Sequence, residues 1–135
     1  MKIKLDPGAY VPERAHIVDA GLDLRSMETR YVSPGEFESF DTGVHVEIPK
    51  GHVGLITSKS GLMAKGITSR GTIDSGYTGS IKAILFNHGE EGYLVRKGDK
   101  ITQLVVLPCI IEDVELVSHL EETERGSNGF GSTGK

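Results

Sequence analysis

The chain has 135 residues, of which 25% are charged and 37% hydrophobic, and a net charge of −4. This length fits one domain with its own core, and the acidic balance argues against direct nucleic-acid binding, which usually needs a basic surface. One cysteine, Cys109, excludes an internal disulfide, and neither an apolar leader nor a membrane-spanning run is visible. We therefore expect a cytoplasmic protein (host-cell cytoplasm if viral) without a membrane partner.

Short segments of alternating apolar residues, separated by turn residues, follow one another along the chain. The pattern is clearest at 44–48, where Val44, Val46 and Ile48 alternate with polar residues, as in a half-buried strand. Further strands are predicted at 3–5, 20–24, 53–56, 71–74, 81–86, 92–95, 101–107 and 114–117. This spacing predicts an all-β fold, a sandwich or barrel.

One short helix is predicted over Ser58–Lys65, with Gly66 as the residue that follows its C-terminus. Ser58 or Ser60 can cap this helix. Its free N–H groups, with Lys59 in the first turn, would make a site of phosphate size. The serines can equally serve as caps and nothing more, so both interpretations stay open.

The stretch Gly71–Asn87 predicts a β-hairpin with an acid at its bend. Asp74 ends the first strand, turn residues follow it, and the return strand at 81–86 is largely apolar on both faces. A carboxylate at the mouth of a rigid hairpin is a candidate general base, and Tyr77 beside it offers a flat face and a hydroxyl. The alternative is an ordinary exposed turn aspartate.

The C-terminal stretch 125–135 differs in kind, being rich in glycine and serine. It cannot bury enough surface to fold alone, so it is either a disordered end or a mobile lid in which Arg125 grips an anion and Phe130 stacks on a ring. We divide the chain into a barrel domain, 1–124, and this lid. Asp23 is either a solvated carboxylate or a contact to a divalent ion through water, as Mg²⁺ prefers.

Five motifs, taken in order, resemble those of the homotrimeric dUTPases, the dUTP nucleotidohydrolases, over nearly the whole chain. The motifs are Ala20–Leu24, Thr57–Leu62, Gly71–Gly79, Lys97–Leu104 and Arg125–Gly134. The resemblance implies a jelly-roll β-barrel, a homotrimer with sites shared between subunits, and hydrolysis of dUTP to dUMP and pyrophosphate by water attack on the α-phosphate. Such an enzyme limits uracil incorporation into DNA and supplies dUMP for dTTP synthesis.

The same resemblance implies roles for single residues. Asp74 would be the general base, and Tyr77 would pack against the deoxyribose and exclude a 2′-hydroxyl. The hairpin backbone would pair with the uracil edge. Mg²⁺ would bind the triphosphate, with Asp23 helping through water. The other implied substrate contacts are Lys59, Ser60, Gly61, Thr68, Thr72, Ile73, Lys82, Gln103 and, from the tail of a neighbouring subunit, Arg125, Phe130, Gly131, Ser132 and Thr133.

The sequence departs from the family pattern at three positions. Lys59 stands where arginine is common, Thr68 where many members have asparagine, and Thr78 where arginine often follows the tyrosine. Two other functions compete with the dUTPase hypothesis. A dCTP deaminase would need a carboxylate on the return strand, and 82–87 contains none. A binding module that keeps the trimer without catalysis is the third hypothesis.

Overall fold

The structure, a computed structural model, describes residues 1–129. Within them the chain forms strands and one short helix, and no helix among these residues is long and apolar enough to span a membrane. The elements are β1 (Lys2–Leu5), β2 (Leu22–Arg25), β3 (Arg30–Val32), β4 (Phe37–Asp41), β5 (Val44–Glu47), β6 (His52–Thr57), α1 (Ser60–Met63), β7 (Ile67–Ile73), β8 (Lys82–Asn87), β9 (Tyr93–Val95) and β10 (Lys100–Pro108).

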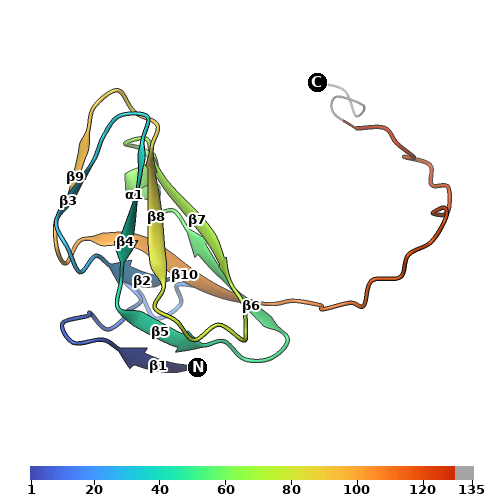
Figure 1. The fold of residues 1–135 in the computed structure, drawn as a ribbon, viewed down its shortest axis with the longest axis horizontal. Coiled ribbons are helices and arrows are strands. Elements are labelled where there is room, and N and C mark those ends of the chain that lie inside the picture. Colours follow the sequence, from blue (N-terminus) through green and yellow to red (C-terminus); the bar gives the residue numbers. More distant parts are fainter. Residues whose placement is uncertain (130–135) are drawn as a thin grey trace.

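The strands form one large antiparallel sheet and two small ones. The large sheet has six strands in the order β2-β10-β6-β7-β8-β4, and β1 pairs with β5 and β3 with β9. The large sheet curls, and the small sheets close over its open sides, so that the strands enclose a core (Figure 1). The prediction of an all-β, jelly-roll-like barrel is confirmed.

The core consists of two clusters of inward-facing side chains. One includes Val44, Val46 and Ile48, each at most 3% exposed, so the alternation read from the sequence marks a true buried face. The other gathers around Phe40 and Leu85, both fully buried. Burial of these branched and aromatic side chains fixes the register of the strands that carry the candidate site.

The helix is shorter than predicted, because it begins at Ser60 and ends at Met63. Neither serine caps it: Lys59 occupies the N-cap position and makes no side-chain capping bond. The Ser58 hydroxyl instead accepts the Ser69 N–H (2.8 Å) and donates to the Ser69 carbonyl oxygen (2.9 Å), which ties the helix entry to β7. Gly66, predicted to follow the helix directly, instead comes three residues after Met63, because the helix is shorter, and it has a φ of +76°.

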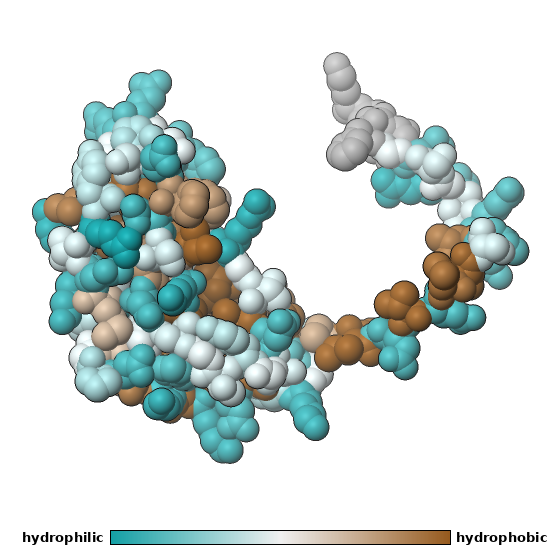
Figure 2. All heavy atoms as spheres, in the orientation of Figure 1, coloured by the Kyte–Doolittle hydropathy of each residue, from teal (hydrophilic) through white to brown (hydrophobic). Residues whose placement is uncertain are grey.

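The strand predicted at 114–117 is wrong. Among residues 109–129 the chain forms no strand and runs as an arm that leads away from the barrel (Figure 1). Val114 and Leu116 are each 98% exposed, and hydrophobic residues follow one another along the arm (Figure 2). Apolar alternation becomes a strand only beside a hydrogen-bonding neighbour, which the arm lacks in the single described chain. The division at 124/125 stays a prediction.

Candidate functional site

The predicted hairpin is present, and it opens toward its bend. β7 and β8 pair only at the α1 end, from Ile67↔Asn87 to Ser69↔Leu85. Beyond Ser69, β7 pairs with β6 and β8 with β4, so the two strands separate toward the connecting loop (Figure 1). The edges of β7 and β8 that face each other there carry backbone groups outside the β7–β8 ladder. This opening can accept a flat ligand that has its own donors and acceptors.

Asp74 lies directly after β7 and is exposed, at the start of the loop that joins β7 to β8. The Tyr77 N–H donates to the Asp74 carbonyl oxygen (3.0 Å), which closes a turn. The Tyr77 hydroxyl donates to the Ser80 carbonyl oxygen (3.0 Å), and its ring lies over Gly79. A Cβ at Gly79 would come within 2.9 Å of Tyr77 Cε2, so this packing requires glycine.

The return strand is buried on one face only, although both of its faces are largely apolar. Ile81, Ala83 and Leu85 are fully buried, whereas Ile84 is 38% exposed and Lys82 is exposed. The alternation of β8 sends the second set of side chains to the outer face of the sheet, which no other element of the described chain covers.

A second group of predicted residues lines a groove at the start of α1. The groove has a volume of about 580 Å³, and its lining includes Lys59, Ser60, Gly61 and Gln103, together with Lys100. The Gln103 amide donates to the Ser58 carbonyl oxygen (3.3 Å). The ammonium groups of Lys59, Lys65 and Lys100, with a hydroxyl and an amide at the same groove, suit an anion such as a phosphate.

Asp23 lies beneath this groove and is buried, only 5% exposed, so it is not the solvated carboxylate of the alternative interpretation. One carboxylate oxygen accepts from the Lys59 ammonium and the other lies 2.9 Å from Lys100 Nζ. Burial by itself would raise the pKa of Asp23, but the hydrogen bonds and charges of Lys59 and Lys100 lower it below its usual value. Asp23 therefore stays ionised and holds both lysines at the groove.

The hairpin mouth and the groove lie at opposite ends of one ladder. β6 and β7 pair from Gly54↔Ile73 to Thr57↔Arg70, a length of about 10 Å at 3.3 Å per residue. Asp74 follows one end of this ladder and Lys59 follows the other, so the chain does not bring them together. The groove lining correspondingly lacks Asp74.

The remaining predicted residues divide between these places. Thr72 and Lys82 are exposed near the hairpin mouth, whereas the Ile73 side chain is 9% exposed and packs in the core, so only its backbone can reach a ligand. Thr68 lies at the far end of β7, about 20 Å from Asp74 along the strand, with its hydroxyl 2.8 Å from His88 Nε2.

The tail residues stand apart from both places. The Arg125 side chain donates to the carbonyl oxygen of nearby Asn128 (3.2 Å). The four predicted contacts Phe130, Gly131, Ser132 and Thr133 lie outside the described residues.

Sequence reasoning missed Lys100 as a member of the groove. Its side chain reaches Asp23 because β10 pairs with β2, with Lys100 opposite Arg25 and Gln103 opposite Asp23. Only knowledge of that register could have revealed the contact.

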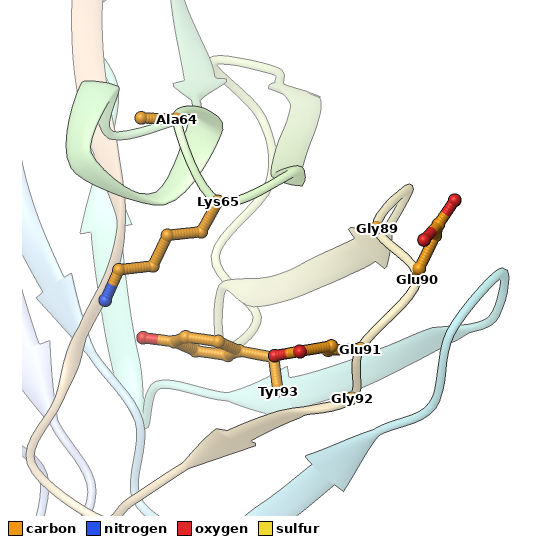
Figure 3. A pocket seen from close by; sticks show the side chains of 7 residues that line it. All are labelled: Ala64, Lys65, Gly89, Glu90, Glu91, Gly92 and Tyr93. Carbon is orange, nitrogen blue, oxygen red and sulfur yellow. The ribbon is translucent and has the colours of Figure 1, made fainter.

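Another hollow, of about 480 Å³, lies between the end of α1 and the loop 89–92, with Lys65 reaching over the Tyr93 ring (Figure 3). It contains none of the predicted site residues.

Fold and site together define a jelly-roll β-barrel protein with an acid and a tyrosine at an open hairpin and a separate cationic groove that suits an anion. The family model described as dUTPase matches residues 8–134. The chain belongs to the dUTPase family.

Relatives and solved structures agree with this assignment. A deoxyuridine 5'-triphosphate nucleotidohydrolase of Clostridium tetani is 45% identical, over 100% of this chain and 97% of its own length. The structure is similar to a variant dUTPase of Staphylococcus bacteriophage 80alpha with dUpNHpp, with a TM-score of 0.92, 33% identity and coverage of 99% of this chain and 98% of that one. A variant dUTPase of phage phi11 of S. aureus, described with a structural Mg(II) ion, matches with a TM-score of 0.81 and 31% identity over 90% of this chain and 98% of its own.

Proposed function

We propose that this chain hydrolyses dUTP to dUMP and pyrophosphate, acting as a dUTP diphosphatase. The observation that carries the proposal is the exposed Asp74 beside Tyr77 at the open hairpin, in a chain that belongs to the dUTPase family. In this reaction Asp74 takes a proton from the water that attacks the α-phosphorus, and pyrophosphate leaves. In the cell this activity limits uracil incorporation into DNA and supplies dUMP for dTTP synthesis.

Recognition of the nucleoside is assigned to the hairpin. The uracil edge pairs with backbone groups at the opening between β7 and β8, near Thr72 and Ile73, where the ladder has ended. Tyr77 packs against the deoxyribose, and its ring, fixed over Gly79, leaves no room for a 2′-hydroxyl. Lys82 borders the same hairpin mouth. Thr68 is also proposed as a substrate contact, although it lies in the paired part of the hairpin, opposite Phe86 and away from Asp74.

Recognition of the phosphates is assigned to the groove. Lys59, Ser60, Gly61 and Gln103 line it and supply an ammonium, a hydroxyl, backbone and an amide. Lys59 makes a point contact with a phosphate where an arginine would make a two-pronged one. Charge neutralisation and alignment of this kind are the main source of catalysis in phosphoanhydride hydrolysis.

Magnesium enters this scheme with the substrate. Among residues 1–129 there is no cluster of three or more His, Cys, Asp or Glu side chains that could hold a metal ion. Asp23 does not fit direct ligation, because its two oxygens are engaged by Lys59 and Lys100. Mg²⁺ would be held mainly by the triphosphate of the substrate, where it would neutralise phosphate charge, and Asp23 would contribute through water.

The complete site is proposed to form between copies of the chain in a homotrimer. Two observations support this: the hairpin mouth and the groove lie at opposite ends of the β6–β7 ladder, and apolar side chains on the outer sheet face are uncovered, with Phe37 58%, Ile84 38% and Leu107 42% exposed. The groove of one copy then faces the hairpin of the next. The tail of a further copy brings Arg125, Phe130, Gly131, Ser132 and Thr133 as the lid.

The test is a product assay with Mg²⁺ and, separately, dUTP, dCTP, UTP and dTTP, followed by phosphorus NMR and ion exchange. We expect dUMP and pyrophosphate from dUTP alone. A uracil nucleotide from dCTP would assign the chain to the deaminases. No turnover, with dUTP still raising the unfolding temperature, would mean a binding module that has kept the site and lost the chemistry.

A further inference from the structure

His45, in the middle of β5, makes a contact that the sequence did not reveal. Its Nδ1 lies 2.8 Å from the Thr78 carbonyl oxygen, and its Nε2 lies 3.0 Å from the Asp6 carboxylate. Both partners are hydrogen-bond acceptors. A neutral imidazole has one N–H and can satisfy only one of them, whereas the imidazolium donates to both.

Thr78 belongs to the loop that carries the proposed catalytic machinery. It follows Tyr77. Two later residues of the loop, Ser80 and Ile81, are held by residues 41–44, which directly precede His45. The Ser80 hydroxyl donates to the Asp41 carboxylate. The Ile81 N–H donates to the Val44 carbonyl oxygen (2.8 Å), and the Ile81 carbonyl oxygen accepts from the Thr42 hydroxyl (2.7 Å).

The contacts that hold the end of the loop, from Thr78 to Ile81, differ in their sensitivity to pH. Ile81 is fully buried and held by backbone and hydroxyl groups that do not titrate near neutral pH. Thr78 is exposed, and His45 is the side chain that reaches its carbonyl oxygen. The part of this stretch nearest Tyr77 therefore depends on a group whose charge changes close to physiological pH.

We infer that His45, as an imidazolium bridging Asp6 and Thr78, is a positioning residue for the hairpin loop that carries Tyr77 and Asp74. It touches neither the substrate nor the reacting atoms. It fixes the carbonyl next to Tyr77, and thereby the place of the ring over Gly79. The kinetic part of this inference rests on the proposed function, whereas the structural part does not.

The charges around His45 set the direction of its titration. The hydrogen bond to the Thr78 carbonyl and then that to Asp6 raise the pKa of His45 above its ordinary value of 6.5, against the effects of desolvation and of Lys4, its cross-strand neighbour. Asp41 also faces His45 and favours the charged form. Lys2 and Glu47 lie two register positions away and pair with each other (3.0 Å), so their charges offset.

Because the pKa of His45 is raised in the folded state, the stability that the bridge contributes depends on pH. A group with a raised pKa in the folded state stabilises that state fully below its unfolded pKa of about 6.5 and loses the contribution as pH rises through the folded value. The bridge is thus complete in mildly acidic solution and is lost on the alkaline side. Loss of one N–H leaves either Thr78 or Asp6 without a donor.

The first experiment is an NMR titration of the histidine Cε1 signals in the full chain without nucleotide. We expect His45 to titrate above 6.5 and its midpoint to fall in Asp6→Asn, because an amide can donate to a neutral ring. In parallel, hydrogen exchange gives the protection factors of the Tyr77 and Ile81 amides, which are compared at about pH 6 and about pH 9. Protection at Tyr77 should fall at the higher pH, with that at Ile81 largely kept.

The matched variants are His45→Gln and His52→Gln. His52 is a half-exposed histidine at the start of β6, and its Nδ1 lies 3.2 Å from the Lys50 carbonyl oxygen. His45→Gln should lower protection at Tyr77 below that of the wild type at about pH 6 and match the wild type at about pH 9. Protection at Ser69, at the other end of β7, should stay unchanged, and His52→Gln should change neither. Unchanged Ser69 protection shows that the barrel of the variant is folded.

The kinetic readout separates positioning from catalysis. For His45→Gln we expect a KM for dUTP raised about threefold to tenfold at about pH 6, with kcat within about twofold, and a difference from the wild type that shrinks by about pH 9. A His45 midpoint at or below 6.5, or unchanged Tyr77 protection in His45→Gln, would overturn the inference. Absence of dUTP turnover in the wild type would refute the proposed function and leave the titration and exchange results to decide on His45.

Discussion

The two ends of the β6–β7 ladder hold their functional side chains in different ways. At the groove, Asp23 is buried and fixed between the ammonium groups of Lys59 and Lys100. At the hairpin, Asp74 is exposed and takes part in none of the ion pairs among residues 1–129, while the loop around it is shaped by hydrogen bonds and close packing. Ion pairs therefore fix the side chains at the end proposed to bind phosphates, whereas hydrogen bonds and close packing fix the end proposed to bind the nucleoside and the water.

The largest effect on activity is expected at the exposed acid. Asp74→Asn removes the proposed base and should lower kcat by about 10²- to 10⁴-fold, while dUTP binding persists. Because Asp74 is exposed, the free energy of unfolding should change by less than about 0.5 kcal/mol. Steady-state kinetics, dUTP titration by calorimetry and urea unfolding measure the three quantities. Glu36→Gln, at an exposed turn on another face, serves as control; near-normal kcat in Asp74→Asn would assign the base elsewhere.

The second effect comes from the tail, which belongs to neither end of the ladder within one chain. A chain that stops at Glu124 should keep the barrel, since the described bonds of Arg125 and Gly126 are to Asn128 and Thr123. Without the lid, phosphate alignment is lost, and kcat/KM should fall by about 10²-fold. Sedimentation must show the same assembly for both chains. Full activity of the shortened chain would exclude the lid.

A shape change tests the hairpin end. Gly79→Ala places a Cβ about 2.9 Å from Tyr77 Cε2, so the ring must move. We expect the preference for dUTP over UTP to narrow by about tenfold, on the order of the 1.4 kcal/mol that one close contact can contribute to discrimination. Gly76→Ala is the matched control, because a Cβ at Gly76 meets nothing within 4 Å. An unchanged ratio in Gly79→Ala would place sugar selection outside Tyr77.

The same contrast explains what the sequence could predict. The strand at Val44–Glu47 and the turn at Asp74 depend on neighbours in the chain, and both are visible in the order of residues. The Asp23–Lys100 contact depends on the pairing of β2 with β10, which no local pattern encodes. Likewise, the apolar alternation around Val114 resembles a strand but forms none, because strand formation requires a neighbouring edge that the described chain does not offer.

At the groove, substitution of Asp23 is expected to have the smallest effect on turnover but a clear effect on the free energy of unfolding. Asp23→Asn breaks two charge-assisted hydrogen bonds and should lower the free energy of unfolding by about 1–3 kcal/mol at neutral pH. Because the folded pKa of Asp23 is lowered from 3.8, the wild type has this contribution above that value and loses it as pH falls through the folded pKa. The gap between wild type and variant, measured by urea unfolding across acidic pH, should therefore close below about 3.8. Glu47→Gln, which breaks the exposed pair with Lys2 (3.0 Å), should cost less than about 1 kcal/mol; equal losses in the two variants would mean that burial of Asp23 adds nothing to its ion pairs.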